Sequence, residues 1–310
     1  MASEPILAVF DLSVAERSRF SNSKIWRDYF ALTKPEVNFL IAVTTFAGFY
    51  LACSSAGHDF PFLRSINTVL GTLLVASGTG ALNQYIERRF DTQMRRTSRR
   101  PLAAGRLNPS AVLWFGIALS VLGTVYLAAT VNLLASLLAL GTLLSYLFLY
   151  TPLKRKSSLC TLVGAFSGAM PPLIGWAGAS GQLSFGAWIL YFVLFLWQFP
   201  HFMAIAWMYR EDYGRAGYLV LPRDERAKAR VVNWQTLLPL LLLLPVSLLP
   251  ALTGNASIPY CVGTVLLCCA FLYYGVRLVL RKFNSSARQL LAASIIYLPA
   301  AFMLMIVFRK

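Results

Sequence analysis

Apolar stretches almost free of charged residues recur along this chain of 310 residues. Each is long enough to cross the roughly 30 Å hydrocarbon core of a membrane. They do not alternate polar and apolar positions, so they are predicted to be helices rather than barrel strands. Nine spans are expected, at about 36–54, 66–86, 110–129, 132–150, 160–179, 184–208, 235–253, 258–276 and 289–308. The pattern predicts an all-α polytopic membrane protein.

The polar residues between the spans set the expected domain organisation. Residues 34–310 are predicted to form a single transmembrane domain. Residues 1–33 are predicted to be a cytoplasmic N-terminal arm that ends in an interfacial stretch, Trp26–Leu32. The arm contains acidic residues that a transit peptide avoids, and it lacks the apolar core of a signal peptide. Only the weak signal Thr130-Val131-Asn132 separates the third span from the fourth.

The composition agrees with a membrane protein, because 57% of the residues are hydrophobic and only 13% are charged. The net charge of +16 could indicate a nucleic-acid partner, but its distribution does not. Of the 28 Lys and Arg residues, 25 fall in the N-terminal segment or in loops on one side of a nine-span topology. This asymmetry predicts that the N-terminus and the basic loops lie in the cytoplasm, and it argues against a nucleic-acid partner. Together with an arm that resembles neither a transit peptide nor a signal peptide, it favours a bacterial inner membrane. Contact with anionic membrane lipid explains most of these charges.

The second span ends in a cluster of acids and bases, which Pro101 is expected to terminate. Asn83, Glu87 and Asp91 are four residues apart, so they lie on one helix face about 6 Å from one to the next. Carboxylates suit Mg²⁺, and arginines suit phosphate oxygens. The nearby arginines are Arg88, Arg89, Arg95, Arg96, Arg99 and Arg100. The cluster predicts a site for a metal-chelated diphosphate; the alternative is a solvated helix end held by surface ion pairs.

A second acidic cluster is expected at the same membrane face, after the sixth span. Glu211 and Asp212 lie there next to Arg210 and Arg215. Together with the first cluster they could hold metal ions across a cavity. His201 lies two to three turns deeper in this span. A histidine in a membrane helix either contacts a bound ligand or is a hydrogen-bonded packing residue.

A third basic segment, Tyr150 to Lys156, forms a tight loop between the fourth and fifth spans. Its cations either bind an anion or only orient the protein in the membrane. Glycines and prolines then interrupt the fifth span: Gly164, Gly168, Pro171, Pro172 and Gly175. Such residues are tolerated in membrane helices that line a cavity. They would make room for a large flat ligand.

Read from Asn83, the first cluster has the pattern N-x3-E-x3-D-x2-M-x-R-T-x2-R-P-L. In this form it resembles the first aspartate-rich motif of the UbiA-type intramembrane prenyltransferases. The match continues in blocks at 32–35, 150–155, 168–176, 197–202 and 212–222. Among these, the blocks PPLIGW and PHF…DY…AG…LP resemble more narrowly the heme O synthase branch of that family. Motifs cover about residues 30–225, and hydropathy alone covers the rest.

The resemblance implies transfer of farnesyl from farnesyl diphosphate to a vinyl group of heme b, with addition of water. It implies a bundle of about nine helices around a central cavity that is open to the cytoplasmic side and to lipid. Mg²⁺ would be the cofactor, held on the diphosphate by the catalytic residues Asn83, Glu87, Asp91 and Asp212. The diphosphate oxygens would be bound by Lys34, Arg96, Arg100, Tyr150 and Lys154. His201 would contact heme, with ligation of its iron as one option.

Two alternatives stay open from the sequence. A prenyltransferase of the same fold could act on an aromatic, quinone-precursor acceptor, although His201 and the PPLIGW block favour heme. An ion-coupled transporter could bind its ion at the acids, but these lie at helix ends among arginines rather than at the midplane. A heme A synthase or an oxidase-assembly protein could be a further partner, which the sequence does not reveal.

Overall fold

The computed structural model describes residues 22–56, 60–252, 254 and 257–308. These residues form helices joined by turns and loops, and none of them lies in a β-strand. Within them, nine helical segments are long and apolar enough to cross a membrane, which confirms the predicted all-α polytopic class. The first 21 residues of the expected N-terminal arm lie outside the described part of the chain.

Most spanning segments of the described chain are single helices, and two are interrupted. The single helices are α3 (Pro35–Ala56), α4 (Phe62–Asp91), α5 (Pro109–Thr130), α10 (Phe185–Met208), α12 (Glu225–Leu252), α13 (Ile258–Arg281) and α14 (Asn284–Val307). The fourth span consists of α6 (Leu133–Leu144), η1 (Ser145–Tyr150) and α7 (Thr151–Leu153). The fifth consists of α8 (Cys160–Gly168) and α9 (Met170–Ser180). The short helices are α2 (Asn22–Leu32) and α11 (Arg210–Arg215).

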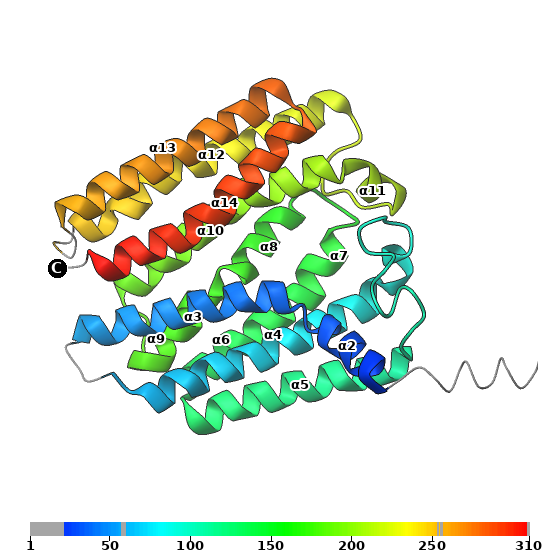
Figure 1. The fold of residues 1–310 in the computed structure, drawn as a ribbon, viewed down its shortest axis with the longest axis horizontal. Coiled ribbons are helices and arrows are strands. Elements are labelled where there is room, and N and C mark those ends of the chain that lie inside the picture. The colour runs from blue at the N-terminus through cyan, green and yellow to red at the C-terminus, as the bar shows by residue number, and fades with distance from the viewer. Residues whose placement is uncertain (1–21, 57–59, 253, 255–256, 309–310) are drawn as a thin grey trace, which may run out of the picture.

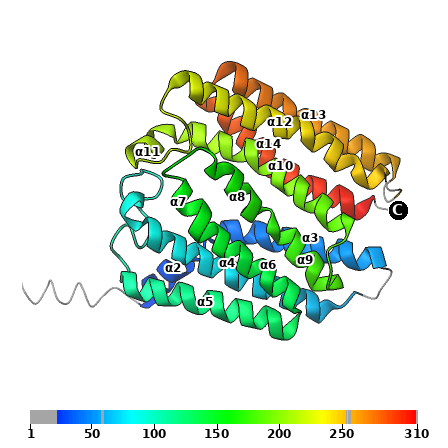
Figure 2. The same cartoon turned by 180° about the vertical axis from the view of Figure 1, so that it is seen from behind.

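The spanning helices form a bundle in which α5 and α13 lie at opposite edges (Figure 1; Figure 2 shows the reverse side). α4 packs against α5, α3 packs against α9, and α10 packs against α12 and α14. α2, the 92–108 loop and α11 lie at the same end of the bundle (Figure 1). Segments that are far apart in the sequence therefore meet at that end.

Two asparagines begin helices by capping them. Asn108 Oδ1 accepts a hydrogen bond from Ser110 N at 2.9 Å, and Pro109 occupies the first turn of α5. Asn132 Oδ1 accepts a hydrogen bond from Ala135 N at 2.8 Å and so begins α6. The weak boundary between the third and fourth spans is therefore a capped helix start.

Glycines let α3 and α9 pack backbone against backbone. A Cβ atom on Gly175 would collide with the Thr45 carbonyl oxygen and would lie 2.9 Å from Phe49 N. A Cβ atom on Gly48 would collide in the same way with the Pro172 carbonyl oxygen. Small residues allow such close approach of membrane helices. At Gly175 the glycine expected to make room for a ligand instead brings two helices together.

Two helix ends differ from the sequence prediction. α4 ends at Asp91 rather than at Pro101, because the following loop folds back and Thr97 Oγ1 donates to the Asp91 carbonyl oxygen at 2.9 Å. α12 begins at Glu225, well before the predicted apolar span, because the Asp224 carboxylate caps its first turn. Ala227 N donates to Asp224 Oδ2 at 2.7 Å. Hydropathy locates the embedded part of a helix, whereas polar contacts beyond it set these ends.

Gly175→Ala is expected to lower the free energy of unfolding by about 2 kcal/mol, because the new methyl group meets backbone atoms of α3. Denaturant unfolding of the detergent-solubilised protein measures this loss. Gly141→Ala is the matched control, since a Cβ atom there has no neighbour within 4 Å and alanine favours a helix. Equal stability of the two variants would contradict the packing argument.

Candidate functional site

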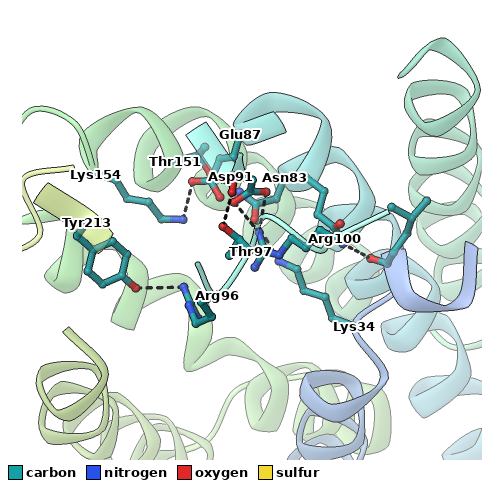
Figure 3. Close-up of polar contacts among 12 residues, drawn as sticks. Lys34, Asn83, Glu87, Asp91, Arg96, Thr97, Arg100, Thr151, Lys154 and Tyr213 are labelled. Carbon is teal, nitrogen blue, oxygen red and sulfur yellow. Dashed lines mark hydrogen bonds and ion pairs between the residues drawn. The ribbon is translucent and has the colours of Figure 1, made fainter. Parts of the chain in front are cut away.

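Asn83, Glu87 and Asp91 form a stripe along one face of α4, called the acidic stripe below. The stripe is buried, and each of its three side chains contacts a basic side chain (Figure 3). Asn83, Glu87 and Asp91 are 1%, 5% and 1% exposed. A solvated helix end would leave them exposed, so that interpretation is wrong. The contacts are Lys34 Nζ to Asn83 Oδ1 (3.1 Å), Lys154 Nζ to Glu87 Oε1 (2.8 Å) and Arg100 Nη1 to Asp91 Oδ1 and Oδ2 (3.0 and 2.8 Å).

Lys34 reaches the stripe from the turn between α2 and α3. Its φ angle of 54° lies in the left-handed region, which is uncommon for a residue other than glycine. Gln84 Nε2 supports the turn by donating to the Leu32 carbonyl oxygen at 3.2 Å, beside Gly80. Burial and the charge of the Arg100 guanidinium lower the pKa of Lys34 to about 7.

Lys154 follows an irregular end of the fourth span. The π-helix η1 places Tyr146 and Tyr150 with their ring centroids 4.9 Å apart, and Lys154 Nζ lies 4.4 Å from the centroid of Tyr150. π-Helical turns of this kind often occur at functional sites. Burial alone would lower the pKa of Lys154, but the Glu87 carboxylate raises it well above its usual range. The ammonium group therefore stays charged.

The 92–108 loop connects the stripe to α11. Arg96 N donates to Asp212 Oδ2 at 3.4 Å. Arg96 Nη2 donates to the Tyr213 hydroxyl oxygen at 3.2 Å (Figure 3). Asp212 is 7% exposed and also pairs with Arg215. The two predicted acidic clusters therefore approach each other, with Arg96 between them.

A cavity of about 600 Å³ opens at the stripe and extends between α3, α10 and α14. Most of the side chains predicted for the site lie together along this cavity. Of the ten side chains predicted for the site, nine line this cavity: Lys34, Asn83, Glu87, Asp91, Arg96, Arg100, Tyr150, Lys154 and His201. Asp212 does not line it, but its carboxylate accepts a hydrogen bond from the backbone of Arg96, which does.

Three tyrosines that sequence analysis missed also line the cavity: Tyr146, Tyr213 and Tyr218. The Tyr218 ring lies near Phe90 and Tyr213, with centroids 5.9 and 6.0 Å away, and is 5% exposed. Its hydroxyl has no hydrogen-bond partner among the described residues. Burial and the nearby Glu87 charge raise its pKa, so the hydroxyl stays a neutral donor. The matched block at 212–222 includes this segment, but nothing in the sequence distinguishes Tyr218 as a candidate site residue.

His201 lies in α10, away from the acidic stripe. Its Nδ1 atom is 2.8 Å from Ser294 Oγ of α14, and its ring stacks on Trp197 with centroids 4.7 Å apart. The ring is thus packed and hydrogen-bonded, and it also lines the cavity. Ser294 is 93 residues away in the sequence, which is why no local pattern could indicate it.

The acidic stripe provides oxygen ligands of the kind that bind a magnesium ion. Asn83, Glu87 and Asp91 supply oxygen atoms only, which Mg²⁺ prefers. Within the described ranges, no three His, Cys, Asp or Glu side chains converge to hold a metal ion by themselves. Mg²⁺ often completes its ligands with substrate phosphates, and the neighbouring cations suit the same phosphates. The arrangement therefore suits a metal diphosphate better than a bare ion.

Residues 41–306 match the model of the UbiA prenyltransferase family. The chain is 48% identical over 292 residues to a protein of Solibacter usitatus named protoheme IX farnesyltransferase, which covers 91% of this chain and 99% of that protein. It is 41% identical over 287 residues to the protein of the same name from Salinibacter ruber, covering 91% of this chain and 98% of the relative.

Solved structures share the fold. A structure of digeranylgeranylglyceryl phosphate synthase matches with a TM-score of 0.74 at 19% identity, covering 91% of this chain and 98% of the other. A UbiA homologue from Archaeoglobus fulgidus bound to GPP and Mg²⁺ matches with a TM-score of 0.56 at 15% identity, covering 90% and 100%. At these identities the likeness concerns the helical fold alone.

Lys154→Met is expected to lower the free energy of unfolding by roughly 3 kcal/mol, because it leaves the buried Glu87 carboxylate without its partner. The double variant Lys154→Met/Glu87→Gln should recover most of that loss, since it buries no unpaired charge. Denaturant unfolding of the two single variants and the double variant measures the coupling. Losses that simply add in the double variant would show that the two side chains are not coupled.

Proposed function

This chain belongs to the UbiA prenyltransferase family, and we propose that it transfers farnesyl from farnesyl diphosphate to a vinyl group of heme b. Water adds in the same overall reaction and gives the hydroxyethylfarnesyl side chain of heme O. The observation that carries the proposal is the cavity that joins a buried cluster of acids and cations to His201. The names of the two relatives from Solibacter and Salinibacter support heme as the acceptor.

The charged end of the cavity would bind farnesyl diphosphate, the prenyl donor. Lys34, Arg100 and Lys154 present their nitrogen atoms there, and they would bind the diphosphate oxygens. Arg96 and Tyr150, which line the same space, would extend this set. As pyrophosphate leaves, its negative charge grows, and these donors would stabilise it without moving far.

The oxygen donors of α4 would hold Mg²⁺ on the diphosphate. Asn83, Glu87 and Asp91 form this set, and Asp212 would act from outside the cavity wall, through Arg96 or after a movement of the 92–108 loop. Bound Mg²⁺ would supply positive charge that favours departure of pyrophosphate. The Archaeoglobus homologue binds GPP together with Mg²⁺, which supports this cofactor.

The acceptor would lie toward His201, where the cavity wall is mostly apolar. Leu194, Phe202, Ile205 and Ile295 line that part. The carbon–oxygen bond of farnesyl diphosphate breaks, and the freed farnesyl carbon bonds to the vinyl group of heme b. Water then adds a hydroxyl group to the neighbouring vinyl carbon and releases a proton. An apolar wall would keep water from the farnesyl cation until the carbon–carbon bond has formed.

The chain is a multi-pass membrane protein, and its orientation is part of the proposal. The acidic stripe and its cations lie at the end of the bundle that carries the basic loops. Positively charged loops favour the cytoplasmic side, so this end would face the cytoplasm of a bacterial inner membrane. Farnesyl diphosphate would then reach the site from the cytoplasm and heme b from the lipid.

The proposal predicts magnesium-dependent formation of heme O by the purified protein. Incubation with heme b, farnesyl diphosphate and Mg²⁺, followed by mass analysis of the extracted heme, should show the gain of one farnesyl group and one water. Asp91→Asn should reduce this rate roughly 100-fold or more, because a charged ligand is lost. Glu225→Gln is the control, since that acid is exposed and does not line the cavity.

Transfer to an aromatic acceptor but not to heme would be consistent with the prenyltransferase family but would contradict heme b as the acceptor. Transfer that is fully active in Asp91→Asn would overturn the metal-binding role of the stripe. No transfer to either acceptor by a folded protein, with ion-dependent uptake into vesicles instead, would favour the transporter.

Tyr218→Phe is expected to raise the KM for farnesyl diphosphate about 3- to 10-fold, because the lost hydroxyl would donate one hydrogen bond to the diphosphate. The same variant should unfold no more easily than the wild type, because the hydroxyl has no partner without substrate. Tyr126→Phe is the control, since that hydroxyl bonds Asn67 outside the cavity. An unchanged KM together with lowered stability would assign Tyr218 to packing alone.

A further inference from the structure

Ser294 of α14 is fully buried, at 0% exposure, and makes three polar contacts, one of them with His201. Its hydroxyl oxygen lies 2.6 Å from the Leu291 carbonyl oxygen and 2.8 Å from His201 Nδ1. Its carbonyl oxygen accepts a hydrogen bond from Trp197 Nε1 at 2.7 Å. One serine thus links α14 to two residues of α10.

The hydroxyl contacts determine which nitrogen of His201 carries a proton. Two oxygen atoms 2.6 Å apart need a hydrogen between them, and the Leu291 carbonyl cannot supply one. The single proton of the Ser294 hydroxyl is therefore donated to Leu291. Toward His201 the same oxygen can only accept, so Nδ1 carries the hydrogen. In the neutral ring, Nε2 then keeps a free lone pair.

The ring is also held in orientation. Trp197 stacks on it with centroids 4.7 Å apart and planes inclined by 25°, and the same tryptophan is fixed by the Ser294 carbonyl. Phe202 contacts the ring edge-on at 5.8 Å. The Nδ1 edge therefore faces α14. The Nε2 edge is left toward the cavity that His201 lines, and no described residue bonds Nε2.

We propose that Ser294 is a positioning residue that holds His201 with its free Nε2 lone pair toward the acceptor, where it binds the iron of heme b. The inference rests on the proposed function and adds to it which nitrogen is the ligand and what orients it. A packing role explains the Nδ1 bond but leaves Nε2 without any partner in the described structure. Metal-binding histidines typically donate their other N–H to an oxygen, which fixes the tautomer and raises ligand basicity.

Heme binding without farnesyl diphosphate separates this role from catalysis. The full-length protein in detergent is titrated with heme b, and absorption and resonance Raman spectra are recorded. Wild type should show an iron–imidazole stretching band, and His201→Ala should lack it. Ser294→Ala should shift that band to lower frequency and weaken heme affinity roughly 10-fold, because Nδ1–H loses its acceptor. Ser294→Thr keeps the hydroxyl and should restore the wild-type band.

Ser286→Ala is the matched control, because Ser286 is a buried serine of the same helix that does not line the cavity. It should leave the band and the affinity unchanged. A band that survives in His201→Ala would overturn the ligand, and identical spectra for wild type and Ser294→Ala would overturn the positioning role. Both results are compatible with heme farnesylation by the wild type, so they would leave the proposed function standing. A wild type that neither binds nor farnesylates heme would overturn both.

Discussion

A charged side chain within a membrane span is costly unless it has a partner, and this requirement organises one end of the bundle. The carboxylates of Glu87 and Asp91 are buried at the end of α4. Arg100, the partner of Asp91, lies in the loop that follows α4 itself, whereas Lys154, the partner of Glu87, follows the fourth span. These ion pairs determine where the loops lie, and the loops in turn form the mouth of the cavity. The contacts that hold this end together are therefore the same contacts that shape the site.

The cavity has two chemically different parts, and the difference follows from the helices that build it. α4 and the 92–108 loop bring acids and cations to one end, whereas α10 and α14 contribute mainly apolar side chains and His201. The negative charge of a diphosphate would be favourable only in the first part, whereas the apolar second part suits a porphyrin ring. An allylic group that leaves the charged end would meet an acceptor within the same space. The separation would also keep the released pyrophosphate among the cations, away from the carbon centre that reacts.

The sequence was sufficient for the spans, because apolar length alone defines them, and for the stripe, because helical periodicity brings Asn83, Glu87 and Asp91 together. It was not sufficient for the partners. Periodicity identifies a face of a helix but not what packs on it, so Ser294 and the role of Tyr218 became visible only in three dimensions. The end of α4 was misplaced because Thr97 closes the loop onto Asp91, a contact that hydropathy does not record.

The charges that line the cavity bear on the form in which farnesyl diphosphate would bind under the proposed function. Four basic side chains, those of Lys34, Arg96, Arg100 and Lys154, and three carboxylates, those of Glu36, Glu87 and Asp91, line it. The lowered pKa of Lys34 leaves its amine only partly protonated near pH 7. The lining alone is thus close to neutral and would bind a free diphosphate only weakly. A diphosphate ester that carries one Mg²⁺ keeps about one net negative charge, which this lining can match. Under the proposed function the carboxylates would therefore not oppose binding of the diphosphate, because they would favour the metal complex over the free anion.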